Sequence, residues 1–392
     1  MLKLAPSTRI EIETDNTVHI TKGQLSLRCQ AHALAILNAF TSPKRFSEAL
    51  EHLGKDTSGT LDWIQLVNTI TNLHEIGVLV AEGETTGGGQ DTAGFGSQWV
   101  HIQMLNDRVR TTNFIKAIRE VVQFDDVVVD IGTGTGVLAI AAAQAGARHV
   151  YAIEATGISE AARAMIEANG MRHRISLIEG WSTRVSLPEP ADVLISEVIG
   201  NDPLSEDILA VLMDARRRFL KKDARFIPNK IRILGVPVAI PEFKMSEYLF
   251  SNENVAAWND WYGIDFRPLL PAQSEWRTSF FIKPQEISEW KTFSPPIILA
   301  EIDTGGLTQV AISKQVEASA TTSGLCNGVV LFFELDLTEN FRLSTSPKTA
   351  DANNHWGSKV FLLPQPIALD AGNLFKLNYA CSMGKSRLEI LA

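Results

Sequence analysis

Two glutamates in the stretch SEVIGNDPLSE, Glu197 and Glu206, lie nine positions apart, and Glu197 comes just after the apolar run ADVLI. Two carboxylates that converge on one point can accept hydrogen bonds from different nitrogens of a planar, permanently charged guanidinium. Such a pair would hold an arginine side chain in a fixed plane, and alignment of this kind can lower a displacement barrier by roughly 7 to 11 kcal/mol. The alternative is a helix-capping acid beside an unrelated surface acid.

A second group of residues has the types and spacing of a nucleoside site. The stretch VVVDIGTGTGVLAI places Asp130 at the end of an apolar run and then Gly132, Gly134 and Gly136 before a helical pattern. Glycines at such a turn let the backbone approach a ligand above the carboxyl end of a strand. The spacing lacks the third glycine position of a dinucleotide-binding loop. Glu154 ends the next apolar run, HVYAIEA, where an acid can accept hydrogen bonds from two ribose hydroxyls. A plain tight turn and a solvated strand-end charge are the alternatives.

These residues lie in a region where strand and helix patterns alternate, from about residue 100 to residue 228. Such alternation predicts a parallel sheet covered by helices on both faces. Residues 229–392 instead show apolar runs between turn residues, which predicts an antiparallel β domain. Within it, an aromatic segment of helical character at about 241–272 is expected to pack on another surface, such as a second subunit.

Residues 1–82 combine short strand-like runs with three helical patterns, which predicts a small α+β domain of winged-helix-like type. Its acidic residues outnumber its basic ones, so DNA binding is not expected. The segment loosely resembles small winged-helix domains that present peptides to modifying enzymes, and a structural cap or dimer element is equally open. Residues 83–99 are rich in Gly and Thr and are predicted to form a linker with a loop.

Composition restricts the class of protein further. The chain has 392 residues, a formal net charge of -9 and a charged fraction of 21%, which together predict several soluble domains. An acidic chain is not expected to bind nucleic acid or a membrane surface, because both are polyanions. Cys29, Cys326 and Cys381 are widely separated, odd in number and lack metal-ligand spacing, which fits a reducing compartment without a disulfide framework. No apolar run fits a signal peptide or a membrane span, so the expected location is cytoplasmic.

Four stretches carry a resemblance to a known family. DIGTGTG followed by AIE is similar to the first two motifs of class I S-adenosylmethionine-dependent methyltransferases. HIQMLNDRVRT, residues 101–111, is similar to the pattern H-x-x-M-L-x-D-x-V-R-T of the protein arginine methyltransferases. SEVIGNDPLSE resembles that family's double-glutamate loop, and STSPKTADANNHW resembles its threonine-histidine-tryptophan loop. The matches occur in order over residues 100–392.

The resemblance implies a Rossmann-like domain that binds S-adenosylmethionine, a β-barrel-like substrate domain with a helical dimerisation arm, and a homodimer. It implies that Glu197 and Glu206 hold the acceptor guanidinium. Met104 would line the methyl-transfer site, His355 would hydrogen-bond an acid of the site, and Trp356 would form a wall of the arginine pocket. Arg110 would pair with the carboxylate of the cofactor. The implied cofactor-binding residues are His101, Arg110, Asp130, Gly132, Gly134, Gly136 and Glu154.

The chain departs from the family pattern at three places. Asn354 stands where the third loop has threonine, and residues 91–95 lack both tyrosines of the family's Tyr-Phe-x-x-Tyr element. Thr183 and Arg184 stand where acids near the adenine are common. The substrate pocket and the adenine contact are therefore open.

We expect an S-adenosylmethionine-dependent N-methyltransferase that acts on the guanidinium of arginine in a peptide, in a protein or in a small guanidino compound, without a metal ion. Two alternatives stay open from the sequence. One is a methyltransferase for a different nucleophile on the same fold, and the other is a non-catalytic scaffold protein that retains the cofactor fold.

Overall fold

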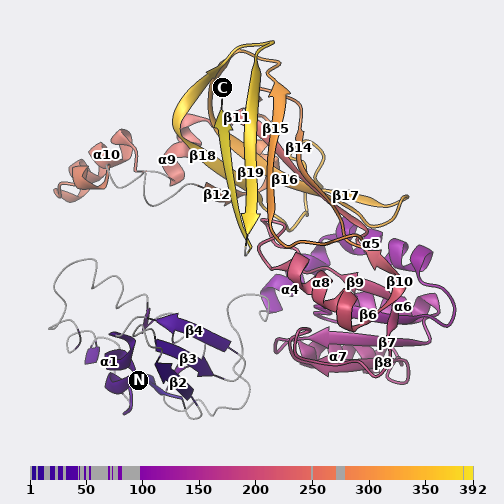
Figure 1. Ribbon diagram of the computed structural model, residues 1–392. Helices are drawn as coiled ribbons and strands as arrows, with labels where there is room; N and C mark the ends of the chain where they lie inside the picture. The colour runs from indigo at the N-terminus through magenta and orange to yellow at the C-terminus, as the bar shows by residue number, and fades with distance from the viewer. Residues whose placement is uncertain are drawn as a thin grey trace. The chain divides into compact units, whose positions relative to one another are not determined.

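The chain forms two compact units, Met1–Ser97 and Gln98–Ala392 (Figure 1). The computed structural model describes residues 2–5, 8–12, 18–22, 25–29, 32–42, 44, 48–49, 53, 69–70, 73, 78–81, 98–248, 250–270, 279–382 and 384–391. Among these residues, no helix is both long and apolar enough to cross a membrane.

The first unit contains two small antiparallel sheets and a helix. Its elements are β1 (Leu2–Leu4), β2 (Thr8–Ile12), β3 (Val18–Lys22), β4 (Leu25–Cys29), α1 (His32–Ala39) and β5 (Leu79–Ala81). Strands β2, β3 and β4 form one sheet, and β1 pairs with β5. Ile20, Ile36 and Phe40 are fully buried in a core of its own. The second and third predicted helices lie largely outside the described residues, so the winged-helix assignment stays a prediction.

The second unit begins with the α/β part. Its strands are β6 (Val127–Ile131), β7 (His149–Glu154), β8 (Ile175–Glu179), β9 (Ala191–Ser196) and β10 (Leu220–Ile227), and its helices are α4 (Gln98–Asn106), α5 (Arg108–Val121), α6 (Val137–Ala145), α7 (Ser159–Ala168) and α8 (Ile208–Arg218). The strands form a five-stranded sheet in the order β10-β9-β6-β7-β8, in which every pair is parallel. Helices α5 to α8 pack against it (Figure 1). The predicted parallel α/β sheet is confirmed.

The register of this sheet brings the predicted site residues to one edge. Ile131 at the end of β6 lies beside Ile153 of β7 and beside Ser196 of β9. The residues that follow, the glycine loop after β6 and Glu197 after β9, therefore leave the sheet side by side, next to Glu154 at the end of β7. Ligands of open parallel sheets bind at this carboxyl edge.

The rest of the second unit is rich in β-strands. Its strands are β11 (Lys230–Ala239), β12 (Ser279–Ile282), β13 (Lys291–Thr292), β14 (Ile297–Asp303), β15 (Ile312–Ser319), β16 (Gly324–Asp336), β17 (Arg342–Ser344), β18 (Ser358–Leu369), β19 (Leu374–Ser382) and β20 (Lys385–Leu391). They form a seven-stranded and a three-stranded sheet, and each of their recorded pairs is antiparallel. The predicted antiparallel β character is confirmed, whereas closure into a barrel stays a prediction.

Short helices interrupt the β-rich part, namely α9 (Glu242–Tyr248), α10 (Asn252–Tyr262), η2 (Arg267–Leu269) and α12 (Pro284–Ile287). Helix α10 begins where the Ser251 side chain accepts a hydrogen bond from the N–H of Asn254, and it ends at Gly263 in the left-handed conformation. The ring of Trp258 contacts Phe250 and Phe266 edge-on, which gives this segment some packing of its own. It lies within the range predicted for the arm.

One hydrophobic core extends through both parts of the second unit. Buried side chains of the parallel sheet, such as Val129, belong to the same packed cluster as Phe333 of β16 and Tyr379 of β19. The α/β part and the β-rich part therefore hold each other in place, and a site built from both has a fixed geometry.

Candidate active site

The loop after β6 has the backbone that only glycine adopts readily. Gly132, Gly134 and Gly136 have φ angles of 75°, 55° and 82°. A Cβ atom on Gly132 would lie 2.6 Å from Cγ2 of Val198, and one on Gly134 would lie 3.0 Å from Cε1 of His101. The missing side chains thus leave room for the segment after β9 and for the buried His101 ring.

Glu154 fixes this loop to the end of β7. One oxygen of its buried carboxylate accepts a hydrogen bond from the N–H of Gly134 at 2.8 Å. The other oxygen accepts from the N–H and the hydroxyl of Thr156, at 2.9 and 2.8 Å. The predicted ribose-binding acid is therefore at the carboxyl edge, held by protein donors.

Asp130 lies beneath the loop and is fully buried. Its Oδ2 accepts a hydrogen bond from the hydroxyl of Thr133 at 2.6 Å, and its Oδ1 is buried without a partner among the described residues. Burial, together with the negative charges of Glu154 and Glu197, raises the pKa of Asp130 to about 7. The unpartnered Oδ1 can therefore accept a hydrogen bond from a cationic or N–H group of a bound ligand.

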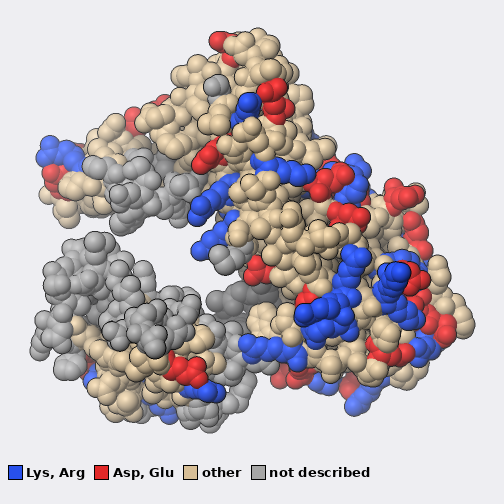
Figure 2. Space-filling view, in the orientation of Figure 1, with Lys and Arg blue, Asp and Glu red and all other residues tan. Residues whose placement is uncertain are grey.

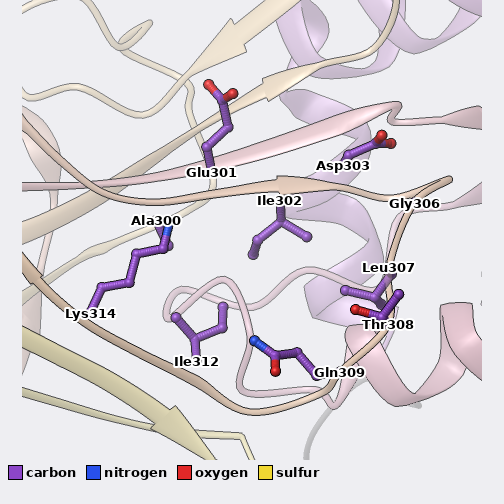
Figure 3. Close-up of a pocket in the computed structure, with 10 residues that line it drawn as sticks. All are labelled: Ala300, Glu301, Ile302, Asp303, Gly306, Leu307, Thr308, Gln309, Ile312 and Lys314. Carbon is purple, nitrogen blue, oxygen red and sulfur yellow. The ribbon is translucent and has the colours of Figure 1, made fainter.

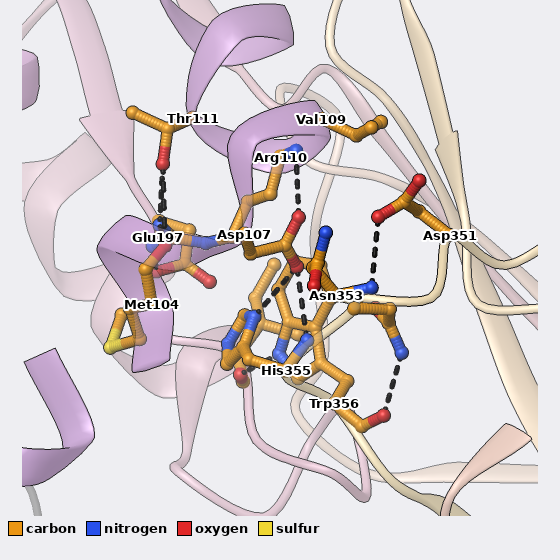
Figure 4. A network of polar contacts seen from close by, with 12 residues as sticks. Met104, Asp107, Val109, Arg110, Thr111, Glu197, Asp351, Asn353, His355 and Trp356 are labelled. Atoms are coloured by element: carbon orange, nitrogen blue, oxygen red, sulfur yellow. Dashed lines mark hydrogen bonds and ion pairs between the residues drawn. The ribbon is translucent and has the colours of Figure 1, made fainter. Parts of the chain in front are cut away.

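Helices α4 and α5 meet at Asp107, a residue that the sequence analysis did not select. Its Oδ1 accepts a hydrogen bond from the N–H of Arg110 at 3.0 Å and caps α5. Its Oδ2 accepts from the N–H of His355 at 3.1 Å and contacts Nδ1 of that ring at 3.0 Å (Figure 4). Although burial opposes the shift, these hydrogen bonds lower the pKa of Asp107. Asp107 is the acid of the H-x-x-M-L-x-D pattern, and that position was the available signal.

Arg110 lies in the middle of the site and binds Glu197. The two side chains, both buried, form an ion pair between Nη2 and Oε2 (Figure 4). The guanidinium also lies over the rings of Trp356 and Phe114, 5.8 and 5.9 Å from their centroids. Its Nε has no hydrogen-bond partner in the described part of the chain. The expected cation is present, but here its partner is a protein carboxylate.

Glu197 and Glu206 come from the two ends of one loop and lie near enough for the charge of Glu197 to act on Glu206. Glu197 follows β9 directly, and Glu206 returns on the loop before α8. Each keeps one buried oxygen, Oε1, for which the described residues supply no donor. Burial, and then the charge of Glu197, raises the pKa of Glu206 to about 8. Two neighbouring acceptors without donors form a site that a cation with several N–H groups would satisfy.

Trp356 and His355 reach this site from the loop before β18. Trp356 is buried, its ring contacts that of Phe333, and its Nε1 donates a hydrogen bond to the carbonyl oxygen of Ile199 at 2.8 Å. Asn354, which stands where the family has threonine, donates to the carbonyl oxygen of Trp356 at 2.7 Å. The substituted residue thus still holds the loop.

Met104 lies half-buried on α4, and its carbonyl oxygen faces Arg110 Nη1 and the Thr111 hydroxyl, each at 3.4 Å (Figure 4). All twelve predicted site residues lie in the second unit, at the ends of β6 and β7 and on the loops and helices nearby. Thr183 and Arg184, in the segment between β8 and β9, are exposed. Residues 91–95, which lack the two tyrosines, lie outside the described residues.

A separate hollow of about 240 Å³ lies between β14 and the segment that leads into β15 (Figure 3). Ile302 and Ile312 point into it, and it shares no residue with the site described above. The described residues contain no group of three or more His, Cys, Asp or Glu side chains placed to hold a metal ion.

The donor set fits S-adenosylmethionine. Gly132 and Gly134 form a tight turn at the sheet edge, where the backbone can approach a ligand, and Glu154 provides an acid at the end of the second strand. Arg110 provides a cation for the ligand's carboxylate, and the unpaired Oδ1 of Asp130 provides an acceptor for a donor group. The residues that would hold the cofactor are thus present at one edge.

Comparisons with known proteins agree with this geometry. Residues 109–268 match the family model described as ribosomal protein L11 methyltransferase (PrmA), and residues 243–389 match the arginine methyltransferase oligomerization subdomain. The chain is 30% identical over 321 residues to protein arginine N-methyltransferase PRMT10 of Arabidopsis thaliana, covering 74% of this chain and 81% of that protein. It is 28% identical over 292 residues to protein arginine N-methyltransferase 1 of Schizosaccharomyces pombe, covering 73% and 82% of the two chains.

Solved structures share the fold of this chain. The crystal structure of Arabidopsis thaliana protein arginine methyltransferase 10 superposes with a TM-score of 0.59 at 25% identity, covering 75% of this chain and 97% of that one. The Trypanosoma brucei PRMT1 enzyme-prozyme heterotetrameric complex with AdoHcy superposes with a TM-score of 0.64 at 23% identity, covering 74% and 89%. With the carboxylate pair, the glycine loop and these relatives together, the chain belongs to the protein arginine N-methyltransferase family of S-adenosylmethionine-dependent enzymes.

Proposed function

We propose that this protein transfers the methyl group of S-adenosylmethionine to a guanidinium nitrogen of arginine in a peptide or protein. The observation that carries the proposal is the carboxylate pair: Glu197 already binds one guanidinium, that of Arg110, and both Glu197 and Glu206 keep a buried acceptor without a donor. Trp356 supplies a flat apolar wall beside them, and a guanidinium stacks well on such a ring.

The cofactor supplies an electrophilic methyl group when it is bound. The chain's own residues then have two tasks, to orient the acceptor and to accept its proton. Glu197 and Glu206 hold the guanidinium in one plane, so that a single nitrogen faces the methyl group. That nitrogen loses one proton as its new bond to carbon forms. Glu206 is suited to accept it, because a carboxyl whose pKa is raised to about 8 is a stronger base than an ordinary one, and the bound guanidinium cation favours its ionised form.

Replacing either glutamate by glutamine tests the carboxylate pair. Glu197→Gln or Glu206→Gln keeps the shape of the site but places an amide donor against the N–H groups of the substrate. Hydrogen bonds to charged groups contribute about 1.5 to 3 kcal/mol, so we expect turnover on an arginine peptide to fall at least tenfold. Cofactor affinity, measured by calorimetry, should stay nearly unchanged.

The matched control is Glu179→Gln. Glu179 is an exposed glutamate at the end of β8 that pairs with Arg163, and this variant should methylate the arginine peptide at the wild-type rate. A peptide with lysine in place of arginine should not be methylated, because a compact ammonium cannot bind two carboxylates in a planar fork. Normal turnover by both glutamine variants, or equal use of lysine, would contradict the proposal.

Two alternatives make different predictions in the same assay. The match to a ribosomal protein L11 methyltransferase model over residues 109–268 favours a different acceptor nitrogen as the second candidate. If this protein used such an acceptor, it would methylate the lysine peptide and not the arginine peptide. A non-catalytic scaffold would bind cofactor and methylate neither peptide.

The arm supports a further proposal, that two copies of the chain associate through residues 241–272. This segment overlaps the match to the oligomerization subdomain. Phe243, Trp261 and Tyr262 are each more than 60% exposed, and large aromatic side chains of this kind are enriched in interface cores. By contrast, the face of the α/β part visible in Figure 2 shows both signs of charge, in keeping with surface pairs such as Arg148–Glu189.

A further inference from the structure

The segment from Glu197 to Asp207, here called the double-glutamate loop, also contains Asp202, an acid more buried than either glutamate. Asp202 is only 2% exposed, and each of its carboxylate oxygens accepts a hydrogen bond. Oδ2 accepts a hydrogen bond from Lys359 Nζ at 2.8 Å, and Oδ1 accepts from the Ser386 hydroxyl at 2.8 Å. A buried carboxylate is costly unless it is paired and hydrogen-bonded, so these two contacts hold Asp202 where it is.

Both partners of Asp202 lie on strands of the β-rich part and are themselves held firmly. Lys359 of β18 has a side chain only 13% exposed, and its Nζ lies 4.9 Å from the ring centroid of Phe361 and 5.9 Å from that of Phe281. Ser386 of β20 also contacts the hydroxyl of the fully buried Tyr379, at 3.1 Å. The attachment point of Asp202 is therefore rigid.

The first half of the loop has two more contacts with the same part of the molecule. The carbonyl oxygen of Ile199 accepts a hydrogen bond from Nε1 of Trp356 at 2.8 Å. The Asn201 side chain accepts from the N–H of Gly357 at 2.6 Å. Four hydrogen bonds, to Ile199, Asn201 and Asp202, thus fix this half of the loop to β18, β20 and the segment before β18.

The second half of the loop folds back from Asp202, which brings Glu206 over Gly200. The N–H of Ser205 donates to the carbonyl oxygen of Asp202 at 2.9 Å. A Cβ atom on Gly200 would lie 2.4 Å from Oγ of Ser205 and 2.9 Å from Oε1 of Glu206. Gly384, before β20, lies against Ser205 so closely that a Cβ there would be 2.7 Å from its carbonyl oxygen. The position of Glu206 therefore depends on the turn that Asp202 anchors.

We propose that Asp202 is a positioning residue: its contacts with Lys359 and Ser386 fix the double-glutamate loop so that Glu206 faces Glu197 across the acceptor guanidinium. This inference rests on the proposed function, because it assigns a purpose to the loop that carries the carboxylate pair. It separates two properties of the enzyme. Acceptor binding depends on Asp202, whereas cofactor binding, which uses residues at the ends of the neighbouring strands β6 and β7, does not.

The test compares Asp202→Asn with a matched ion pair elsewhere. Asparagine keeps the size of the side chain and one acceptor for Ser386, but it removes the negative charge that holds Lys359. The control is Asp336→Asn, because Asp336 forms a similar pair with Arg232, at 2.8 Å and with both side chains 13% exposed, on strands β16 and β11. The acceptor is a synthetic peptide with one arginine that the wild-type protein methylates.

We expect Asp202→Asn to raise KM for this peptide, and its Kd in the presence of S-adenosylhomocysteine, by about tenfold or more. The affinity for S-adenosylhomocysteine itself should stay within about twofold of wild type. Asp336→Asn should lower the melting temperature to a similar extent and leave both affinities unchanged. If the two variants lose only stability and bind the peptide equally well, Asp202 is a structural residue and the proposal is wrong.

Two further variants identify the ion pair as the cause. Lys359→Met should weaken peptide binding as Asp202→Asn does, and the double variant should be no worse than either single variant, because both changes remove the same interaction. Additive losses would overturn the proposal. The outcomes also separate this inference from the proposed function: a normal Asp202→Asn beside an impaired Glu206→Gln overturns only the role of Asp202, whereas a normal Glu206→Gln overturns the carboxylate pair itself. Should Asp202→Asn not fold, Ser386→Ala and Lys359→Met measure the same dependence.

Discussion

At the scale of single residues, burial decides how the acids of the site behave. Asp130 and Glu206 have pKa values of about 7 and about 8, chiefly because their carboxylates are removed from water. Asp107 has a lowered pKa instead, since hydrogen bonds from His355 and from backbone N–H groups compensate for its burial. Acids of the same chemical type, within one site, are thus prepared for different tasks.

The raised pKa values predict how stability changes with pH. Each acid binds its proton more tightly in the folded chain than in the unfolded chain, so its contribution to the free energy of unfolding is largest at acidic pH. That contribution is lost as the pH rises from about 4, the unfolded value, toward 7 for Asp130 and 8 for Glu206. The loss is up to about 1.4 kcal/mol per pH unit for each group.

We therefore expect Glu206→Gln to gain stability relative to wild type as the pH is raised from 5 to 9. Urea unfolding at pH 5, 7 and 9 measures this difference. Glu179→Gln, at an exposed position, is the control variant in the same titration. A difference between Glu206→Gln and wild type that stays constant with pH would mean that this carboxyl is not buried in solution.

At the scale of elements, the turn after β6 can pack closely on the loop after β9 because position 132 carries no side chain. Gly132 has a positive φ angle and lies against Val198, which follows Glu197 directly. Any side chain at position 132 would therefore disturb the double-glutamate loop as well as the backbone of the turn.

Gly132→Ala should lower turnover on an arginine peptide at least tenfold. Two effects combine: left-handed backbone costs a residue with a Cβ roughly 1 to 2 kcal/mol, and the new methyl group displaces Val198. Gly170→Ala is the control, since Gly170 has a φ of 67° and open space around it. It should lose stability alone. Equal turnover in the two variants would show that the contact with Val198 is unimportant.

The arm is the second element whose role can be measured. Changing Phe243 and Trp261 together to alanine should convert a dimer to a monomer, because it removes two exposed aromatic side chains from the proposed interface. Light scattering at micromolar concentration gives the mass. Leu374→Ala, at a position 61% exposed on β19, should leave the dimer intact. A wild-type protein that is already monomeric would rule out the arm as an interface.

At the scale of the whole molecule, the site residues that the structure describes all lie in the second unit. Its α/β and β-rich parts share one hydrophobic core, and the first unit has its own. A protein of residues 83–392 should therefore fold and bind S-adenosylhomocysteine with an affinity within about threefold of the full chain. Calorimetry measures this affinity, and loss of binding would show that the first unit supports the site.

The same truncation tests whether the first unit presents the acceptor. If it does, KM for a peptide should rise while cofactor affinity stays the same. Ile36→Asp, which places a charge in the core of the first unit within the full-length chain, should then give the same result. The location of the protein in the cell stays a prediction from sequence alone.

The sequence by itself determined the features that depend on local chemistry. The glycines after β6, the acids at strand ends and the alternation of strand and helix are local patterns, because backbone geometry and burial of an apolar run act over a few residues. The order of the motifs was enough to identify the family. The residues after β6, β7 and β9 could be expected at one edge because the strands were predicted to be parallel.

Only the tertiary structure decided which side chains meet. Asp107 contacts His355, and Asp202 contacts Lys359, although these pairs are far apart in the chain. Arg110 was expected to face a cofactor, yet it binds Glu197. No local pattern encodes such contacts, because they depend on how the β-rich part packs on the parallel sheet through their shared core. A buried charge takes the partner that this packing places within reach, and that partner is fixed by the fold and not by its neighbours in sequence.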